Sequence, residues 1–192
     1  MKSSLDKAKF FQDNKYCSVE SAIDSSLAQI ATTYTLFKQA LKKDISFNTQ
    51  VPGSFTETYD ALTESLLINL QPIIEANTGL ELIPTYSCYR VYNEGQKLEP
   101  HTDREACEIS ATLCLGYNYD DKNGSWPITV NDMQFFMYPG DLVIYRGVEL
   151  NHSRDIFDKG PNAYHSQVFL HYVDKNGPYT QYAFDERLGI GL

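Results

Sequence analysis

The hydrophobic pattern of the chain changes near residue 80, and this change most limits the folds open to it. From there the apolar residues tend to alternate with polar ones, and the segments are short and rich in β-branched and aromatic residues. Such segments are typical of strands when turn residues separate them. We predict eight strands, near residues 83–92, 98–103, 108–117, 126–130, 133–137, 141–146, 150–157 and 164–174. Eight short strands favour a double-sheet jelly roll or a barrel.

The N-terminal part of the chain has a helical pattern instead. Its first apolar stripe has spacings of three and four residues and comprises Ile23, Leu27, Ile30, Tyr34, Phe37 and Leu41. A second helix is predicted to begin at Ser54, where Glu57 would complete a capping box, and to end or kink at Pro72. We therefore expect a mainly β, α+β fold whose N-terminal helices cover one outer sheet face.

The length of 192 residues suits one domain with a substantial core. We divide it into a helical support region (1–79), a strand core (80–174) and a C-terminal extension (175–192). A net charge of −9 disfavours nucleic acid as a partner, and the absence of a long apolar run argues against a membrane span. The cysteines show no paired spacing, so we expect free thiols and a cytoplasmic protein; they are Cys17, Cys88, Cys107 and Cys114.

Two histidines and an aspartate form a candidate metal site. His101 and Asp103 are two residues apart, so on a strand their side chains project from the same face. His152 follows the predicted strand 141–146. Such a ligand set leaves positions open on iron(II) for a co-substrate and dioxygen. Alone, an H-x-D pair is more often two ordinary polar residues. Its place at a strand end, with a second histidine in the same all-β region, favours the metal site.

Several segments, taken in order, carry a resemblance to a known family. They are Tyr-Arg-Val-Tyr (89–92), His-Thr-Asp (101–103), the strand 109–117, Pro-Gly-Asp-Leu-Val-Ile-Tyr (139–145), Glu-Leu-Asn-His (149–152) and Gln-Val-Phe-Leu-His-Tyr-Val-Asp (167–174). Over residues 86–174 the chain resembles the 2-oxoglutarate/iron(II) dioxygenase superfamily, particularly its prolyl-hydroxylase-like branch. The resemblance implies a distorted double-stranded β-helix, a cupin-like jelly roll, with His101, Asp103 and His152 as iron ligands at one open end.

The resemblance also implies a basic residue on the last core strand that holds the far carboxylate of 2-oxoglutarate. The matching position here is His165, with Gln167 next on the same inward face. Arg154 is a second candidate because strand alternation would aim it into the cavity, although it could instead form a surface ion pair with Asp155. Tyr92 matches a family tyrosine that hydrogen-bonds the co-substrate, or else is a strand-end aromatic residue.

Other polar and aromatic residues have weaker claims. Arg90 and Arg104 could guide an acidic substrate, or could pair with nearby carboxylates. Trp126 and Phe135 are expected in the sheet core, where aromatic side chains bury the most area. His171 alternates inward on the last strand, and we expect it to be structural.

The resemblance implies oxidation of a C–H bond by iron, dioxygen and 2-oxoglutarate, with release of succinate and carbon dioxide. Ascorbate is a candidate reductant, and hydroxylation is the default outcome. The substrate is expected to be a small molecule or an amino-acid or peptidyl residue. Two alternatives stay open at this point. A cupin-like enzyme could use the same ligands for zinc or manganese, and a binding module could keep the fold without catalysis.

Overall fold

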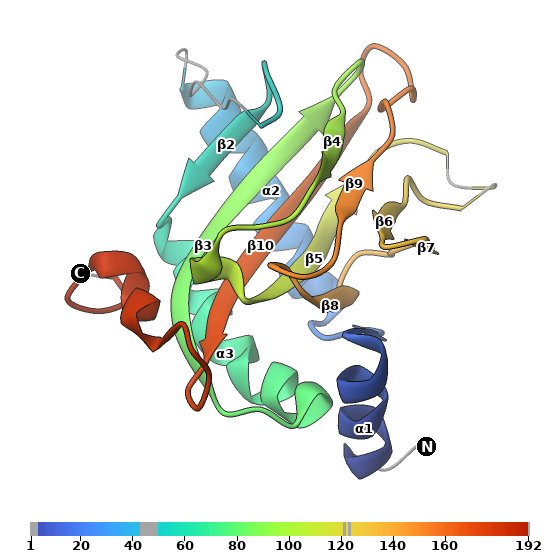
Figure 1. Ribbon diagram of the computed structural model, residues 1–192. Coiled ribbons are helices and arrows are strands. Elements are labelled where there is room, and N and C mark those ends of the chain that lie inside the picture. The colour runs from blue at the N-terminus through green and yellow to red at the C-terminus, as the bar shows by residue number, and fades with distance from the viewer. Residues whose placement is uncertain (1–3, 43–49, 121, 123, 192) are drawn as a thin grey trace.

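Two antiparallel sheets lie face to face in the computed structural model, which describes residues 4–42, 50–120, 122 and 124–191 (Figure 1). The larger sheet has the order β1 (Tyr16–Val19), β8 (Leu142–Arg146), β5 (Ile109–Tyr117), β10 (Tyr164–Asp174), β3 (Leu82–Asn93) and β2 (Phe55–Thr58). The smaller sheet has the order β4 (Leu98–His101), β9 (His152–Arg154), β6 (Ile128–Val130) and β7 (Met133–Phe135). This architecture is a double-stranded β-helix.

All eight strands predicted after residue 80 are present, with ends shifted by a few residues. The N-terminal region also contributes β1 and β2, which were not predicted. These two strands form the outer edges of the larger sheet, where β1 pairs with β8 and β2 pairs with β3. Each has only four residues, which is too short for alternation to distinguish a strand from a loop.

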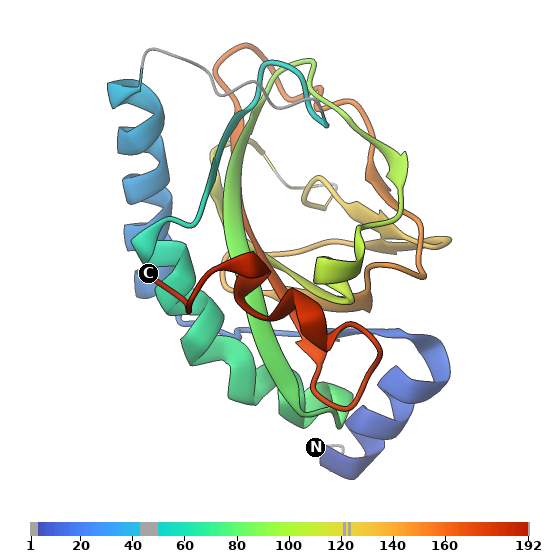
Figure 2. The same cartoon turned by 60° about the vertical axis from the view of Figure 1, so that its left-hand side comes forward.

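Helices α2 (Ser25–Leu41) and α3 (Ala61–Thr78) cover the outer face of the larger sheet, while α1 (Ser4–Asn14) lies beside α3 (Figure 2). The predicted stripe is wrong at Ile30, Phe37 and Leu41, which are 64%, 65% and 80% exposed. The helix instead buries its small side chains, Ala28, Ala31, Thr32 and Thr35. Small residues allow the helix to approach β5 closely. No helix in the described ranges is long and apolar enough to cross a membrane.

The predicted start of the second helix is also wrong. Ser54 precedes β2, and its hydroxyl donates to the Val51 carbonyl oxygen at 2.8 Å instead of capping a helix. Helix α3 begins at Ala61, where the Asp60 carboxylate accepts a hydrogen bond from the Leu62 amide at 3.0 Å. Pro72 lies inside α3 and does not end it. The helix ends at Gly79, whose positive φ of 72° completes the terminal turn.

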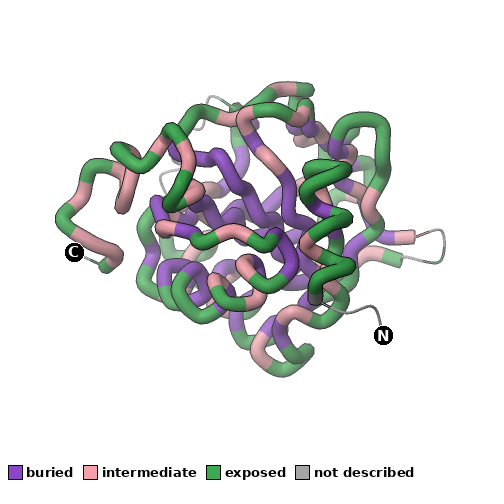
Figure 3. The backbone as a smooth tube through the Cα atoms, turned by 60° about the horizontal axis from the view of Figure 1, so that its bottom comes forward, coloured by how far each residue is buried: buried purple, intermediate pink, exposed green. Residues whose placement is uncertain are grey.

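Buried residues are concentrated in the middle of the molecule (Figure 3). The largest apolar cluster lies between that sheet and the helices. Two smaller clusters lie between the sheets; one contains buried Trp126, and the other packs against half-buried Phe135.

All four cysteines are free. The C-terminal extension includes the short helix η2 (Thr180–Glu186), which runs along β3. The remaining space between the sheets holds polar side chains.

The close contact between α2 and β5 gives a test of this packing. A methyl group on Gly116 would lie 2.6 Å from the Thr32 hydroxyl oxygen. We expect Gly116→Ala to lower the free energy of unfolding by about 1–3 kcal/mol, the usual cost of overpacking. Urea denaturation measures it. Adding Thr32→Ala should recover part of the loss, and an unchanged stability in Gly116→Ala would contradict this seating of α2.

Candidate metal centre

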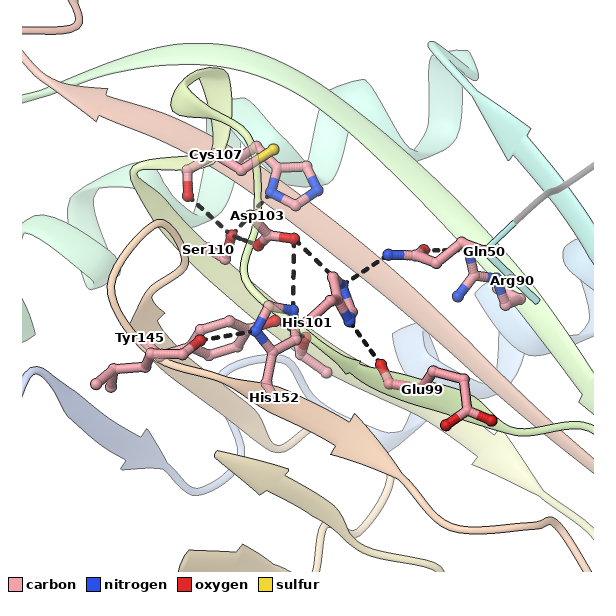
Figure 4. Close-up of polar contacts among 12 residues, drawn as sticks. Gln50, Arg90, Glu99, His101, Asp103, Cys107, Ser110, Tyr145 and His152 are labelled. Atoms are coloured by element: carbon pink, nitrogen blue, oxygen red, sulfur yellow. Dashed lines mark hydrogen bonds and ion pairs between the residues drawn. The ribbon is translucent and has the colours of Figure 1, made fainter. Parts of the chain in front are cut away.

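His101, Asp103 and His152 come together at one end of the smaller sheet. Their ligand atoms all lie within 4.8 Å of one another. His101 and His152 are direct partners across the antiparallel β4–β9 pair, and their ring centroids are 4.2 Å apart. One Asp103 carboxylate oxygen lies 3.6 Å from His101 Nε2 and 3.4 Å from His152 Nε2 (Figure 4). Two imidazole nitrogens and a carboxylate oxygen therefore converge as the sequence predicted.

Backbone carbonyls orient both imidazoles. His101 Nδ1 lies 2.8 Å from the Glu99 oxygen, and His152 Nδ1 lies 3.1 Å from the Leu150 oxygen. A carbonyl oxygen only accepts, so each Nδ1 carries the proton and donates. In the neutral ring the lone pair is then on Nε2, which faces Asp103, and only the protonated ring donates from Nε2 to that carboxylate. The neutral form is the tautomer required of a metal-ligating histidine whose other nitrogen is held by the protein.

The predicted strand 98–103 would have included Asp103. In the structure β4 ends at His101, so Asp103 lies two residues beyond the strand. Its backbone amide donates to the Gly147 oxygen at 2.9 Å, and Ser110 Oγ donates to its second carboxylate oxygen at 2.7 Å. Burial alone would raise the pKa of Asp103. Hydrogen bonds and attraction from His101 and His152 outweigh burial and hold that pKa well below its usual range. The carboxylate is thus ionised and available as a ligand.

Ser110 and His171 support Asp103 from behind. His171 Nδ1 lies 3.1 Å from Ser110 Oγ, and the His171 ring packs on Tyr86 at 4.5 Å between centroids. Burial lowers the pKa of His171 to about 4, so this ring is neutral at pH 7. Cys107 is also near Asp103, but burial raises its pKa well above the usual value and keeps it a thiol. His171 therefore has the structural role that was expected: it packs on Tyr86 and helps to orient Ser110, which in turn donates to Asp103.

Arg154 is buried between the sheets, 1% exposed, and follows His152 by two residues on β9. Its guanidinium donates to the Trp126 carbonyl oxygen at 2.8 Å and to Gln167 Oε1 at 2.5 Å, and it lies 4.7 Å from the Trp126 ring centroid. Its Nε has no hydrogen-bond partner in the described part of the chain. The surface-pair alternative is wrong, because Arg154 is buried while Asp155 is exposed, and the two form no ion pair in the described ranges.

The other three predicted anchors lie near Arg154. His165 Nε2 is 3.0 Å from Gln167 Oε1, and His165 Nδ1 is 2.9 Å from the Tyr119 hydroxyl. Burial, together with repulsion from Arg154, holds the pKa of His165 well below its usual value. A neutral His165 cannot supply the charge that a carboxylate anchor needs. Tyr92 is fully buried, with its ring 4.9 Å from that of Trp126. Arg154 therefore provides the positive charge of this group.

A cavity of about 70 Å³ lies beside the three candidate ligands. Gln50 lines it, and Gln50 Nε2 is 2.7 Å from His101 Nε2. Arg90 also lines it and is 3% exposed. Arg104 instead pairs with Asp185 at 2.7 Å, not with its neighbour Glu105. Sequence reasoning missed Gln50, Ser110 and Tyr119. Gln50 and Tyr119 reach the site through contacts between distant segments, whereas Ser110 contacts Asp103 across the turn that precedes β5.

Solved structures share this architecture at low sequence identity. A Pseudomonas putida prolyl-4-hydroxylase has a TM-score of 0.65 at 14% identity, over 91% of this chain and 100% of that one. SnoN, a non-heme alpha ketoglutarate dependent epimerase from nogalamycin biosynthesis, has a TM-score of 0.73 at 13% identity, over 98% and 91%. HygX from Streptomyces hygroscopicus, with nickel and 2-oxoglutarate bound, has a TM-score of 0.64 at 9% identity, over 91% and 88%.

No family model and no curated protein matches the sequence. The likeness therefore lies in the fold, which is that of the 2-oxoglutarate/iron(II) oxygenase structures.

Metal binding at this site should depend on pH. The Asp103 hydrogen bond and attraction, with the Glu99 carbonyl, outweigh burial and raise the pKa of His101 above 6.5. Only neutral imidazole binds metal, so protons compete below that pKa. We expect manganese(II) affinity to fall about tenfold per pH unit there, measured by calorimetry. His101→Gln should weaken binding and flatten this slope, while the control His165→Gln keeps it. An unchanged slope in His101→Gln would exclude His101 as a ligand.

Acid should destabilise the metal-free protein through His171. Its folded-state pKa of about 4 is below the unfolded value near 6.5. Between these values the unfolded chain binds the proton and the folded chain does not. The contribution of His171 to the free energy of unfolding is thus complete above pH 6.5 and falls by on the order of 3 kcal/mol as pH approaches 4. Urea unfolding with a chelator measures this fall. His171→Gln should show a shallower decline, and an equal decline would assign the effect to other groups.

Proposed function

We propose that this protein is an iron(II)- and 2-oxoglutarate-dependent oxygenase that oxidises a C–H bond. The convergence of His101, Asp103 and His152 carries the proposal. Two imidazoles and one carboxylate on one face of a metal leave positions open for other ligands, as in non-haem iron(II) oxygenases. The fixed Nδ1 protons and the ionised carboxylate make the three groups ready to bind a divalent ion.

Arg154 supports the assignment of 2-oxoglutarate as co-substrate. A guanidinium buried without a carboxylate partner is costly, and a bound anion would offset that cost. Its planar fork suits a carboxylate, and its unpartnered Nε is a further donor. Strand alternation places Arg154 on the same face of β9 as His152. We assign Arg154 to the far carboxylate, with Tyr92, His165 and Gln167 as its polar surroundings.

The bound iron and 2-oxoglutarate would supply oxidation of a C–H bond coupled to decarboxylation to succinate. The chain's own residues have a simpler task. His101, Asp103 and His152 hold the metal, Arg154 orients the co-substrate, and the buried walls between the sheets exclude water. No residue needs to act as a general acid or base. Hydroxylation is our default outcome, although the fold neighbours include an epimerase as well as a prolyl-4-hydroxylase.

The co-substrate assignment can be tested by calorimetry with the manganese(II)-loaded protein. Arg154→Met should weaken 2-oxoglutarate binding at least about 30-fold, because truncating a buried charge partner costs ~2–5 kcal/mol. Arg154→Lys keeps the charge without the fork and should lose less. Manganese affinity should stay unchanged in both variants. Equal 2-oxoglutarate affinity in wild type and Arg154→Met would remove this arginine from the site.

Turnover distinguishes the alternatives. With iron(II), ascorbate and 2-oxoglutarate, we expect the wild-type protein to release succinate, and Asp103→Ala to release none. Tight zinc occupancy without succinate would favour a cupin-like enzyme of another reaction class. Failure to bind both metal and 2-oxoglutarate would favour a non-catalytic module.

A further inference from the structure

A buried guanidinium other than that of Arg154 lines the candidate metal cavity: it belongs to Arg90. Arg90 lies on β3 in the larger sheet, and its guanidinium carbon is 5.4 Å from the ring centroids of both Tyr92 and Phe169. It donates to Thr56 Oγ1 and the Tyr92 hydroxyl, each at 3.0 Å, and to Gln50 Oε1 at 2.8 Å. These acceptors are neutral, and within the described ranges no carboxylate pairs with it. Burial of an uncompensated charge is unfavourable unless a ligand neutralises it.

Only one amide group separates Arg90 from a candidate metal ligand. The Gln50 oxygen accepts from Arg90, while the Gln50 nitrogen is 2.7 Å from His101 Nε2 (Figure 4). Nε2 is the atom that would bind the metal. A metal ion on that atom would take the place of the Gln50 contact, so this amide must then move. The Arg90 donor that now holds the amide would be left facing the open side of the metal.

The geometry around Arg90 matches a carboxylate in shape and charge. The Gln50 carboxamide is a planar three-atom group that accepts from the guanidinium, and a carboxylate has the same shape with a negative charge. Three of the five N–H donors of Arg90 are used, so two are left for a bidentate partner. A carboxylate there would neutralise the buried charge, which the amide cannot do.

The two buried arginines have different hydrogen-bond partners, although Tyr92 is near both, because its hydroxyl accepts from Arg90 and its ring packs on Trp126. Arg154 belongs to the smaller sheet and contacts Trp126 and Gln167, whereas Arg90 belongs to the larger sheet and shares no hydrogen-bond acceptor with it. Two separate cationic positions suit two separate anions. Arg104 is not a rival for this role, because it already pairs with Asp185 and is half-exposed.

We propose that Arg90 binds a carboxylate of the substrate, and that the enzyme acts on a small carboxylic acid, such as a free amino or hydroxy acid. This inference rests on the proposed oxygenase function, in which Arg154 holds the co-substrate. The short span across Gln50 places the oxidised carbon near the acid group. A residue inside a peptide chain lacks a free carboxylate unless its side chain is acidic, so recognition by Arg90 selects against most peptide substrates.

The test compares acids with their carboxamides on the full chain loaded with manganese(II) and 2-oxoglutarate. The probes are propionate, L-alanine and L-leucine, each against its carboxamide, with binding followed by calorimetry and thermal unfolding. We expect the wild-type protein to bind at least one acid about tenfold or more tightly than its amide. Arg90→Met should bring that ratio close to one, Arg90→Lys should keep part of it, and Arg104→Met should keep it fully.

Each failure has a separate meaning. If manganese and 2-oxoglutarate do not bind to the wild-type protein, the proposed function fails. If they bind but every acid–amide ratio is near one, only the role of Arg90 is overturned. Loss of 2-oxoglutarate binding in Arg90→Met would make Arg90 the co-substrate anchor and also overturn it. Equally tight binding of a blocked peptide containing glutamate, lost in Arg90→Met, would replace the free acid with an acidic side chain.

Discussion

The antiparallel pairing of β4 with β9 is the constraint on which the candidate site depends. It places His101 opposite His152 and fixes the distance between their rings. Because side chains alternate across a strand, a slip of one residue would turn one imidazole to the other face of the sheet. The Glu99 and Leu150 carbonyls belong to the same pair of chain segments, so the pairing also sets the tautomers.

The sequence predicted those features that leave a pattern within a single segment, such as the strands and the His-x-Asp pair. The strands after residue 80 were predicted from their β-branched and aromatic residues and the turn residues between them, although β5, β8 and β10 are buried on both faces. The buried face of helix α2 was mispredicted because the helix approaches β5 closely, with Thr32 against Gly116, and a local pattern does not show such a contact between distant segments. Alternation and the family resemblance identified the three candidate ligands. The burial of Arg154 could not be decided from sequence, because alternation and a neighbouring Asp155 gave opposite indications.

Electrostatics inside the protein differ from those of the whole chain. The whole chain has a net charge of −9, yet two arginines lie buried between the sheets without carboxylate partners among the described residues. The histidine neighbour of Arg154, His165, is neutral and adds no charge. An acidic exterior with a cationic interior is a suitable arrangement for organic anions, since only molecules that reach the interior meet an attractive potential.

The two sheets differ greatly in the length of their strands. In the smaller sheet β9, β6 and β7 have three residues each, and β4 meets β9 at only two paired positions. Such a sheet opens more readily than one built on β3 and β10. A metal ion bound by both histidines would act as a cross-link between β4 and β9. Metal binding would therefore stabilise the smaller sheet against local opening, and slower amide hydrogen exchange in that sheet would show it.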